Sequence, residues 1–170
     1  ALRQLSFFWG TAVGGRVPPI AEHKLSLVSQ AAGQLGMGVD KVAVRDLASE
    51  IEWAKVSLVT PDTYVERATQ QGRGDVAGHS MSEISQLMRV YEDVKTERNV
   101  IDFEDVLLIL VGILLDRPDI TKQIRHQYRH FVVDEYQDVS PLQHRLLQLW
   151  LGDRKELCVV GDVSQTIYSL

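Results

Sequence analysis

The chain has 170 residues, of which 45% are hydrophobic and 24% are charged, and its net charge is −5. This composition is typical of a globular chain with one domain or two small ones, and it excludes a collagen-like or low-complexity protein. The acidic balance also excludes binding to nucleic acid through overall charge alone. The excess acid lies in residues 101–170, which carry 11 acidic and 7 basic side chains.

Cysteine usage and the lengths of the apolar runs indicate where the protein works. Cys158 is the only cysteine, so no disulfide can form within the chain, and its apolar neighbours predict a buried structural thiol. The first residues lack the basic-then-apolar order of a signal peptide. The longest apolar run, Val106–Leu115, is ten residues long, whereas a bilayer span needs about 20. We therefore expect a cytoplasmic protein with no membrane segment.

Residues 1–100 show helical periodicity and contain no strand candidate. Apolar residues recur three or four positions apart, which predicts a series of amphipathic helices. These helices are expected over residues 1–12, 20–35 and about 40–58, in a short segment from 60, and from 80 onward. The second helix is expected to bury four residues, Leu25, Val28, Ala32 and Leu35. Residues 70–79 are polar and rich in glycine, and they predict a loop.

Residues that favour helix starts precede three of these helices. Asp40 is predicted to cap the third helix with its carboxylate. Thr60 is predicted to cap the fourth, with Pro61 in its first turn. Either Ser80 or Ser82 is predicted to cap the fifth.

Residues 101–170 have a different pattern, in which apolar strands alternate with helices. A helix is expected from Asp102 to about Leu115, and another from Pro118. A buried strand is expected at Phe131–Asp134, a helix capped by Ser140 follows it, and a second buried strand is expected at residues 157–160. A strand, a helix and a strand within about 30 residues predict two parallel strands joined by a crossover.

Acidic side chains follow the first of these strands. Asp134 and Glu135 come at its end, and Asp162 and Gln165 come just after the second strand. Because parallel strands end at the same edge of a sheet, we expect the two groups to lie together, where open α/β sheets bind ligands. One carboxylate could hold Mg²⁺ on a nucleotide while the next polarises the attacking water. The spacing therefore predicts part of a nucleotide-hydrolysing site.

Three segments of the sequence resemble motifs of one protein family. Residues 134–138 resemble helicase motif II, residues 159–168 resemble motif III, and residues 102–107 resemble the Asp-Phe-x-Asp-Leu-Leu stretch upstream of motif II. The family is that of the UvrD/Rep/PcrA-like superfamily 1A DNA helicases, and the chain is most similar to those of high-GC Gram-positive bacteria. The resemblance implies an ATP-dependent helicase that couples ATP hydrolysis to 3′–5′ translocation on single-stranded DNA and to duplex unwinding.

The resemblance also implies an α/β fold in two parts. Residues 1–100 would form a mostly helical region similar to subdomain 1B. Residues 101–170 would form part of a RecA-like, parallel-sheet motor domain, 1A, with motifs II and III but without a phosphate-binding loop.

The family's motif residues map onto four positions of this chain. Asp134 would hold Mg²⁺ on ATP, and Glu135 would act as general base toward the attacking water. Gln165 would contact the γ-phosphate, and Tyr168 would stack on a base of single-stranded DNA. Leu170 stands where the family has an aromatic residue. The implied cofactors are ATP and Mg²⁺, and the implied partners are single-stranded DNA and duplex junctions.

One requirement of an ATP site is missing from the sequence. A phosphate-binding loop needs a Gly-Lys pair, and the chain contains none. We therefore expect a fragment that is inactive alone, with a possible homodimer through its exposed sheet edges. Two alternatives remain open: a non-catalytic binding module derived from a helicase, and a subunit of a helicase–nuclease.

Other polar residues receive structural interpretations. The five histidines lack metal-ligand spacing, so surface or capping roles are predicted for them. Asp102 and Asp105 are interpreted as helix-start residues rather than site residues. Arg73, Lys95 and Arg98 could contact a DNA backbone, but acidic residues interleave with them, which favours a solvated face.

Overall fold

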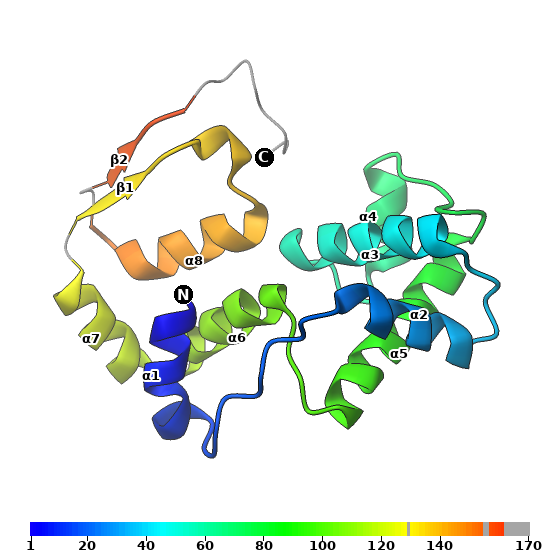
Figure 1. Cartoon of the computed structure of the whole chain (residues 1–170). Helices are drawn as coiled ribbons and strands as arrows, with labels where there is room; N and C mark the ends of the chain where they lie inside the picture. The colour runs from blue at the N-terminus through cyan, green and yellow to red at the C-terminus, as the bar shows by residue number, and fades with distance from the viewer. Residues whose placement is uncertain (129, 155–156, 162–170) are drawn as a thin grey trace. The chain divides into compact units, whose positions relative to one another are not determined.

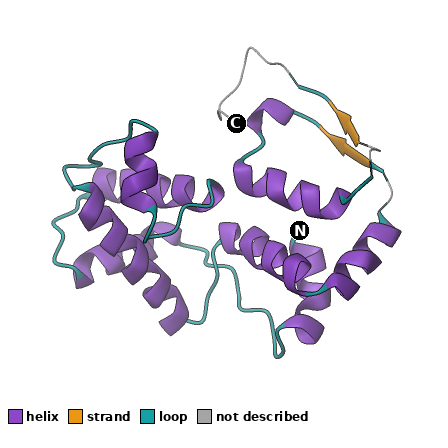
Figure 2. Ribbon diagram, turned by 180° about the vertical axis from the view of Figure 1, so that it is seen from behind, coloured by secondary structure: helices purple, strands orange, loops and turns teal. Residues whose placement is uncertain are grey.

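The computed structural model describes residues 1–128, 130–154 and 157–161. These residues are mostly helical (Figure 1), with a small parallel sheet of two strands, drawn in orange in Figure 2. The elements are α1 Leu2–Ala12, α2 Lys24–Gln34, α3 Lys41–Val56, α4 Tyr64–Gln70, α5 Met81–Glu97, α6 Phe103–Asp116, α7 Pro118–Gln127, β1 Phe131–Val133, the 3₁₀ turn η1 Tyr136–Asp138, α8 Pro141–Leu151 and β2 Leu157–Val159. The chain forms two compact units: a helical unit, Pro18–Glu104, and a strand-bearing unit, which combines Ala1–Val17 with Asp105–Leu170.

The helical unit consists of α2, α3, α4 and α5 around one apolar core. Helix α5 packs against α2 and α4, and α2 packs against α3. Tyr64 of α4 and Tyr91 of α5 are fully buried in this core. Aromatic side chains of this size contribute much of the apolar area that a small unit removes from water.

The buried face of α2 differs in part from the predicted one. Val28 and Ala32 are buried as expected, and Leu27 and Ala31 join them. The predictions for Leu25 and Leu35 are wrong, because Leu25 is 43% exposed and Leu35 is 36% exposed. Leu25 lies in the first turn and Leu35 is the C-cap, so both lie at the ends of the helix while a stripe of small side chains in its middle meets α3 and α5.

The two ends of the helical unit are hydrogen-bonded to each other. Ile20 and Ile101 form a parallel bridge. The N–H of Ala21 donates to the Ile101 carbonyl at 2.8 Å, and the N–H of Ile101 donates to the Pro19 carbonyl at 3.0 Å. The segment that enters the unit and the segment that leaves it therefore lie side by side.

Two helix starts in this unit agree with the sequence. The Asp40 carboxylate accepts hydrogen bonds from the N–H groups of Val42 and Ala43, at 2.9 and 2.8 Å. Ser80, rather than Ser82, caps α5, and with Glu83 it forms a reciprocal capping box. Each arrangement satisfies backbone donors that have no partner within the first turn of a helix.

The start of α4 was predicted too early. The helix begins at Tyr64, with Thr63 as the residue before it, and Thr60–Thr63 forms a turn instead. The Thr63 hydroxyl accepts a hydrogen bond from the Thr60 N–H at 3.1 Å and lies 3.0 Å from the Thr60 hydroxyl. Threonine side chains that bond to nearby backbone in this way compete with helix formation, and here the local turn prevails.

In the strand-bearing unit, the longest apolar run of the sequence forms most of α6. Five of its residues are buried: Val106, Leu110, Val111, Ile113 and Leu114. Helix α1 adds buried Leu5, Phe8 and Trp9 to the same unit. Helix α6 has 14 residues. Among the described residues, no helix combines the length and the apolar character needed to cross a bilayer.

The strand–helix–strand segment has the predicted connectivity. Strands β1 and β2 pair in parallel, with Phe131 opposite Leu157 and Val133 opposite Val159. Helix α8 connects them and begins at Pro141, after a capping box formed by Ser140 and Gln143. The prediction of two parallel strands joined by a helix is confirmed.

The burial predicted for the two strands is wrong, because none of their residues is fully buried and one face is exposed. Side chains alternate between the faces of a sheet, so Val132 and its partner Cys158 share the face opposite to that of Phe131. Phe131 stacks on Trp150 of α8, at 5.9 Å between ring centroids. Val132 is 74% exposed, and Cys158 is exposed rather than a buried thiol. The apolar sequence of a strand does not predict whether one face or both faces of the sheet are covered by other elements.

Two arginines join the ends of α7 and α8, next to the start of β1. The Arg154 guanidinium donates to four carbonyls, those of Arg125, Tyr128, Trp150 and Leu151. The Arg125 Nε donates to the Leu149 carbonyl at 2.9 Å. Cations near the last turn of a helix satisfy carbonyls that lack intrahelical partners.

Candidate nucleotide site at the end of strand β1

Asp134 and Glu135 follow β1 directly, and both side chains are exposed at the end of the strand. The Asp134 Oδ1 accepts a hydrogen bond from the backbone N–H of Glu135 at 2.9 Å. The strand thus delivers two adjacent carboxylates to the edge of the sheet where the sequence predicted them.

The backbone of Glu135 has an unusual conformation. Its φ and ψ are 50° and 48°, in the left-handed region, which costs a residue other than glycine about 1–2 kcal/mol. Such a conformation persists when the surroundings impose it, and it often occurs at functional sites. It reverses the chain after β1 and begins the 3₁₀ turn η1, in which the Asp138 N–H donates to the Glu135 carbonyl at 2.9 Å.

The segment after β2 lies directly against this turn. The Val160 N–H donates to the Val133 carbonyl at 2.8 Å, and the Tyr136 N–H donates to the Val160 carbonyl at 3.0 Å. A Cβ atom at Gly161 would lie 2.5 Å from the Gln137 Oε1 and 3.0 Å from the Tyr136 N. Only a glycine fits this close approach without displacing the Gln137 side chain.

Gln137 in turn contacts the second carboxylate of the pair. Its Nε2 donates to the Glu135 Oε2. The ends of β1 and β2 share one edge, as the sequence predicts, and Gly161 approaches Gln137 there. Asp162, Gln165 and Tyr168 lie outside the described residues, so their predicted positions stay predictions.

Helix α8 contacts the turn through His144, which Gln148 of the same helix contacts in turn. The Tyr136 hydroxyl lies 3.0 Å from the Nδ1 of His144, and the two rings meet edge to face, with centroids 6.2 Å apart. The His144 Nε2 lies 3.0 Å from the Nε2 of Gln148, one turn further along α8. Sequence reasoning gave His144 only a surface or capping role. Its position in the first turn of the helix that follows the acidic motif was the signal that could have indicated a contact with the motif.

A cavity of about 420 Å³ adjoins the acid pair. Its lining combines the end of β1, the turn and α8: Val133, Asp134, Glu135, Asp138, Val139, Gln143, Leu146, Leu147 and Trp150. Among the described residues, the buried Asp138 Oδ1 has no hydrogen-bond partner. Carboxylate oxygens are the ligands that Mg²⁺ prefers, usually one or two of them together with phosphate oxygens. The chemistry of Asp134, with Asp138 near the same cavity, therefore fits a magnesium–nucleotide.

A second cluster of charges, which sequence reasoning missed, lies in the helical unit. The Oδ2 of Asp102 accepts three hydrogen bonds: from the Nζ of Lys55 at 2.6 Å, the Nζ of Lys95 at 3.2 Å and the hydroxyl of Tyr91 at 3.0 Å. Glu92 accepts from both lysines, at 3.1 and 2.7 Å. We call these five residues the lysine–aspartate cluster.

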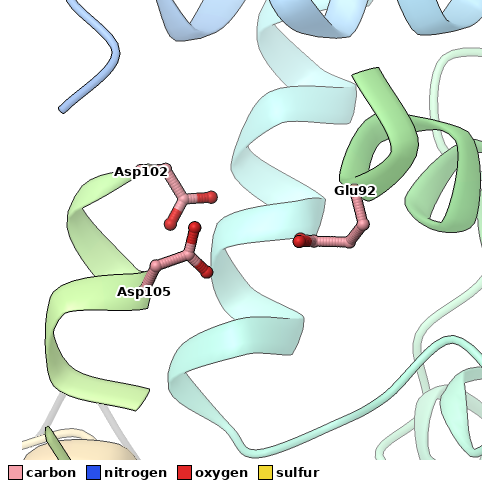
Figure 3. A group of neighbouring side chains, drawn as sticks. All are labelled: Glu92, Asp102 and Asp105. Atoms are coloured by element: carbon pink, nitrogen blue, oxygen red, sulfur yellow. The ribbon is translucent and has the colours of Figure 1, made fainter. Parts of the chain in front are cut away.

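Figure 3 shows the carboxylates of Glu92, on α5, and Asp102, before α6, pointing toward the same space. Asp105, also drawn there, is the first residue of the strand-bearing unit in this part of the chain. Asp102 and Lys95 are each only 2% exposed. Burial, reinforced by the Asp102 carboxylate, raises the pKa of Tyr91 well above its ordinary value. The prediction of a solvated Lys95 is wrong. Asp102 directly precedes α6, as predicted for a helix-start residue, and its carboxylate also binds the two buried lysines.

Arg73 and Arg98, the other cations predicted to lie on a solvated face, also form side-chain hydrogen bonds. Arg73 donates to both carboxylate oxygens of Glu50 and lies 4.0 Å from the centre of the Trp53 ring. Glu50 is buried, and it also accepts from the Tyr64 hydroxyl at 2.9 Å. Arg98 donates to the Gln30 side chain. These contacts bind the loop after α4 to α3, and α5 to α2.

Comparison with known proteins assigns the family. Residues 20–170 match the UvrD/REP helicase N-terminal domain, and the chain belongs to this family. It is 40% identical, over 99% of its length, to the ATP-dependent DNA helicase UvrD2 of Mycobacterium tuberculosis, of which the alignment covers 24%.

Two other relatives are more distant. The ATP-dependent DNA helicase Rep of Escherichia coli is 32% identical over 76% of this chain and 18% of its own length. UvrD1 of Mycobacterium tuberculosis is 29% identical over 88% of this chain and 20% of its own length. The chain thus spans about a quarter of the length of UvrD2 and a smaller share of Rep and UvrD1. The predicted resemblance to UvrD-like helicases of high-GC Gram-positive bacteria is confirmed.

Proposed function

We propose that this chain is part of an ATP-dependent DNA helicase that couples ATP hydrolysis to 3′–5′ translocation on single-stranded DNA and to unwinding of duplex junctions. The observation that carries the proposal is the exposed Asp134–Glu135 pair at the end of a parallel strand, with Glu135 in a left-handed conformation. Membership of the UvrD/REP family supports the same reading. The helical unit would correspond to subdomain 1B and the strand-bearing unit to part of a RecA-like motor domain, 1A.

Each site residue has a distinct role in this proposal. Asp134 would hold the Mg²⁺ that accompanies ATP, and this ion would neutralise charge on the phosphates. Glu135 would accept a proton from the attacking water, because its carboxylate is exposed and the amide of Gln137 fixes one of its two oxygens. Gln165 would contact the γ-phosphate, and Tyr168 would stack on a DNA base, a contact worth about 1–3 kcal/mol per base.

We further propose that the 170 residues alone do not hydrolyse ATP. A site of this class grips the phosphates with the backbone and the lysine of a Gly-Lys loop, and the sequence contains no such pair. Asp134 and Glu135 would then need a phosphate-binding segment from elsewhere in the full-length protein. Steady ATP turnover by the 170-residue chain with Mg²⁺ and single-stranded DNA would contradict this part of the proposal.

The catalytic part is tested by Glu135→Gln in the full-length protein. The substitution keeps the shape of the side chain and removes the base, so we expect DNA-stimulated kcat for ATP to fall at least about 100-fold while ATP still binds. Asp153→Asn is the matched control, since Asp153 is an exposed acid of the same unit. Equal kcat values for both variants and the wild type would refute the assignment and favour the non-catalytic binding module.

A further inference from the structure

The left-handed conformation of Glu135 requires external support, and the structure shows where that support comes from. On the backbone side, Tyr136 donates its N–H to the Val160 carbonyl beside β2. On the side-chain side, its hydroxyl meets His144 of α8. The residue next to Glu135 is therefore held at both ends by two different elements.

The His144 ring has a hydrogen-bond partner at each of its two nitrogens. A tyrosine hydroxyl can donate or accept, so it can pair with the Nδ1 whether or not that nitrogen carries the proton. On the other side of the ring, the Gln148 Nε2 is an amide nitrogen that can only donate, so the His144 Nε2 accepts and the His144 Nδ1 carries the proton and donates to the Tyr136 hydroxyl. The imidazole is thus fixed between two partners that lie on opposite sides of it.

We propose that His144 is a positioning residue for Glu135 and acts through Tyr136. The inference rests on the proposed function. While the Tyr136 ring is held on α8, the peptide between residues 135 and 136 keeps its orientation, and Glu135 stays in its left-handed conformation. If the ring is released, Glu135 can relax to a right-handed conformation, which swings its carboxylate away from the position that the turn gives it.

Such a displacement affects the chemical step more than the binding of ATP. A misplacement of about 1 Å at a catalytic group can reduce a rate about 100-fold. The Asp134 carboxylate, at the end of β1, accepts its hydrogen bond from the backbone N–H of Glu135 and not from the Tyr136 side chain. Loss of the His144 contact should therefore lower kcat and leave the KM for ATP unchanged.

The test uses the full-length protein with the variants His144→Phe, Tyr136→Phe and the double variant. We expect each single variant to lower the DNA-stimulated kcat about tenfold with KM within twofold of the wild type. We expect the double variant to match the single ones, because both remove the same hydrogen bond. His144→Asn retains a polar atom near the position of Nδ1 and should recover most of the lost kcat.

Two controls separate this inference from the proposed function. His126→Phe changes an exposed histidine of the same unit and should leave kcat unchanged. Glu135→Gln, measured in the same assay, reports on the proposed function alone. If Glu135→Gln is inactive while His144→Phe keeps wild-type kcat, or if the effects of His144→Phe and Tyr136→Phe add, the positioning role is overturned and the catalytic assignment stands. A lowered kcat that His144→Asn fails to recover also overturns it.

Discussion

At the scale of single residues, the carboxylate of Asp102 is the centre of the lysine–aspartate cluster. One carboxylate oxygen serves two ammonium groups and a phenol, and all four side chains are buried. Removing one partner of a buried ion pair is costly because the remaining charge stays away from water without compensation. The charges of Lys55 and Lys95 therefore depend on the carboxylate of Asp102 for compensation.

We predict that Asp102→Asn destabilises the chain by about 3–5 kcal/mol, because it removes the buried carboxylate that two buried ammonium groups contact. Urea unfolding of the 170-residue chain measures the change. Asp93→Asn, on the exposed face of α5, is the matched control and should be neutral. Equal stability of the two variants would contradict the role of the cluster.

The sequence predicted the acid pair but missed this cluster, and the reason is sequence distance. Asp134 and Glu135 are adjacent and follow an apolar strand, so a local pattern reveals them. The partners of Asp102 lie 47, 11 and 7 positions away, on two helices. No periodicity connects such residues, and Lys95 is therefore indistinguishable in sequence from a solvated lysine.

At the scale of elements, local chemistry decided most helix starts. Ser80 and Glu83 form their capping box within four residues, and Ser140 with Gln143 does the same. The hydrogen bonds that Glu83 accepts from the Ser80 backbone and hydroxyl lower the pKa of its carboxyl below the ordinary 4.5. Before α4, a turn formed by Thr60 and Thr63 replaces the predicted helix start. In sequence, a threonine that bonds within such a turn looks the same as a threonine that caps a helix.

We predict that Ser80→Ala lowers stability by about 1 kcal/mol at neutral pH, whereas Ser82→Ala, its neighbour and the rejected cap, is near neutral. A lowered pKa in the folded state means that the unfolded state binds the proton more readily, so this contribution is present above pH 4.5 and is lost as the pH falls below it. The gap between wild type and Ser80→Ala should therefore shrink in acid. Unfolding curves from pH 7 to 3 measure it, and a constant gap would contradict the capping box.

At the scale of the whole molecule, the described residues form a mostly helical chain with a small parallel sheet. Sequence patterns predicted the connectivity of that sheet, because strand and helix signals are local. They did not predict which strand faces are covered, since that depends on the number of layers around the sheet. The exposed face formed by Val132 and Cys158 is the result.

This face allows a test of the predicted homodimer. If two copies of the 170-residue chain associate through it, the Cys158 thiol should react more slowly with a thiol reagent as protein concentration rises. Val132→Lys places a charge beside Cys158 and should abolish the concentration dependence. A labelling rate that is independent of concentration in the wild type, together with monomeric light scattering, would contradict the homodimer.

The bridge between Ile20 and Ile101 has a consequence for how this protein can evolve. The two ends of the Pro18–Glu104 unit are hydrogen-bonded to each other. The unit therefore leaves the rest of the chain and returns to it at one place, as a short surface loop does. Segments with adjacent ends are those that tolerate insertion and replacement. The helical unit can therefore change in length or be exchanged between relatives without a change in the backbone of the unit that carries Asp134 and Glu135. We expect relatives to differ most in the helical unit.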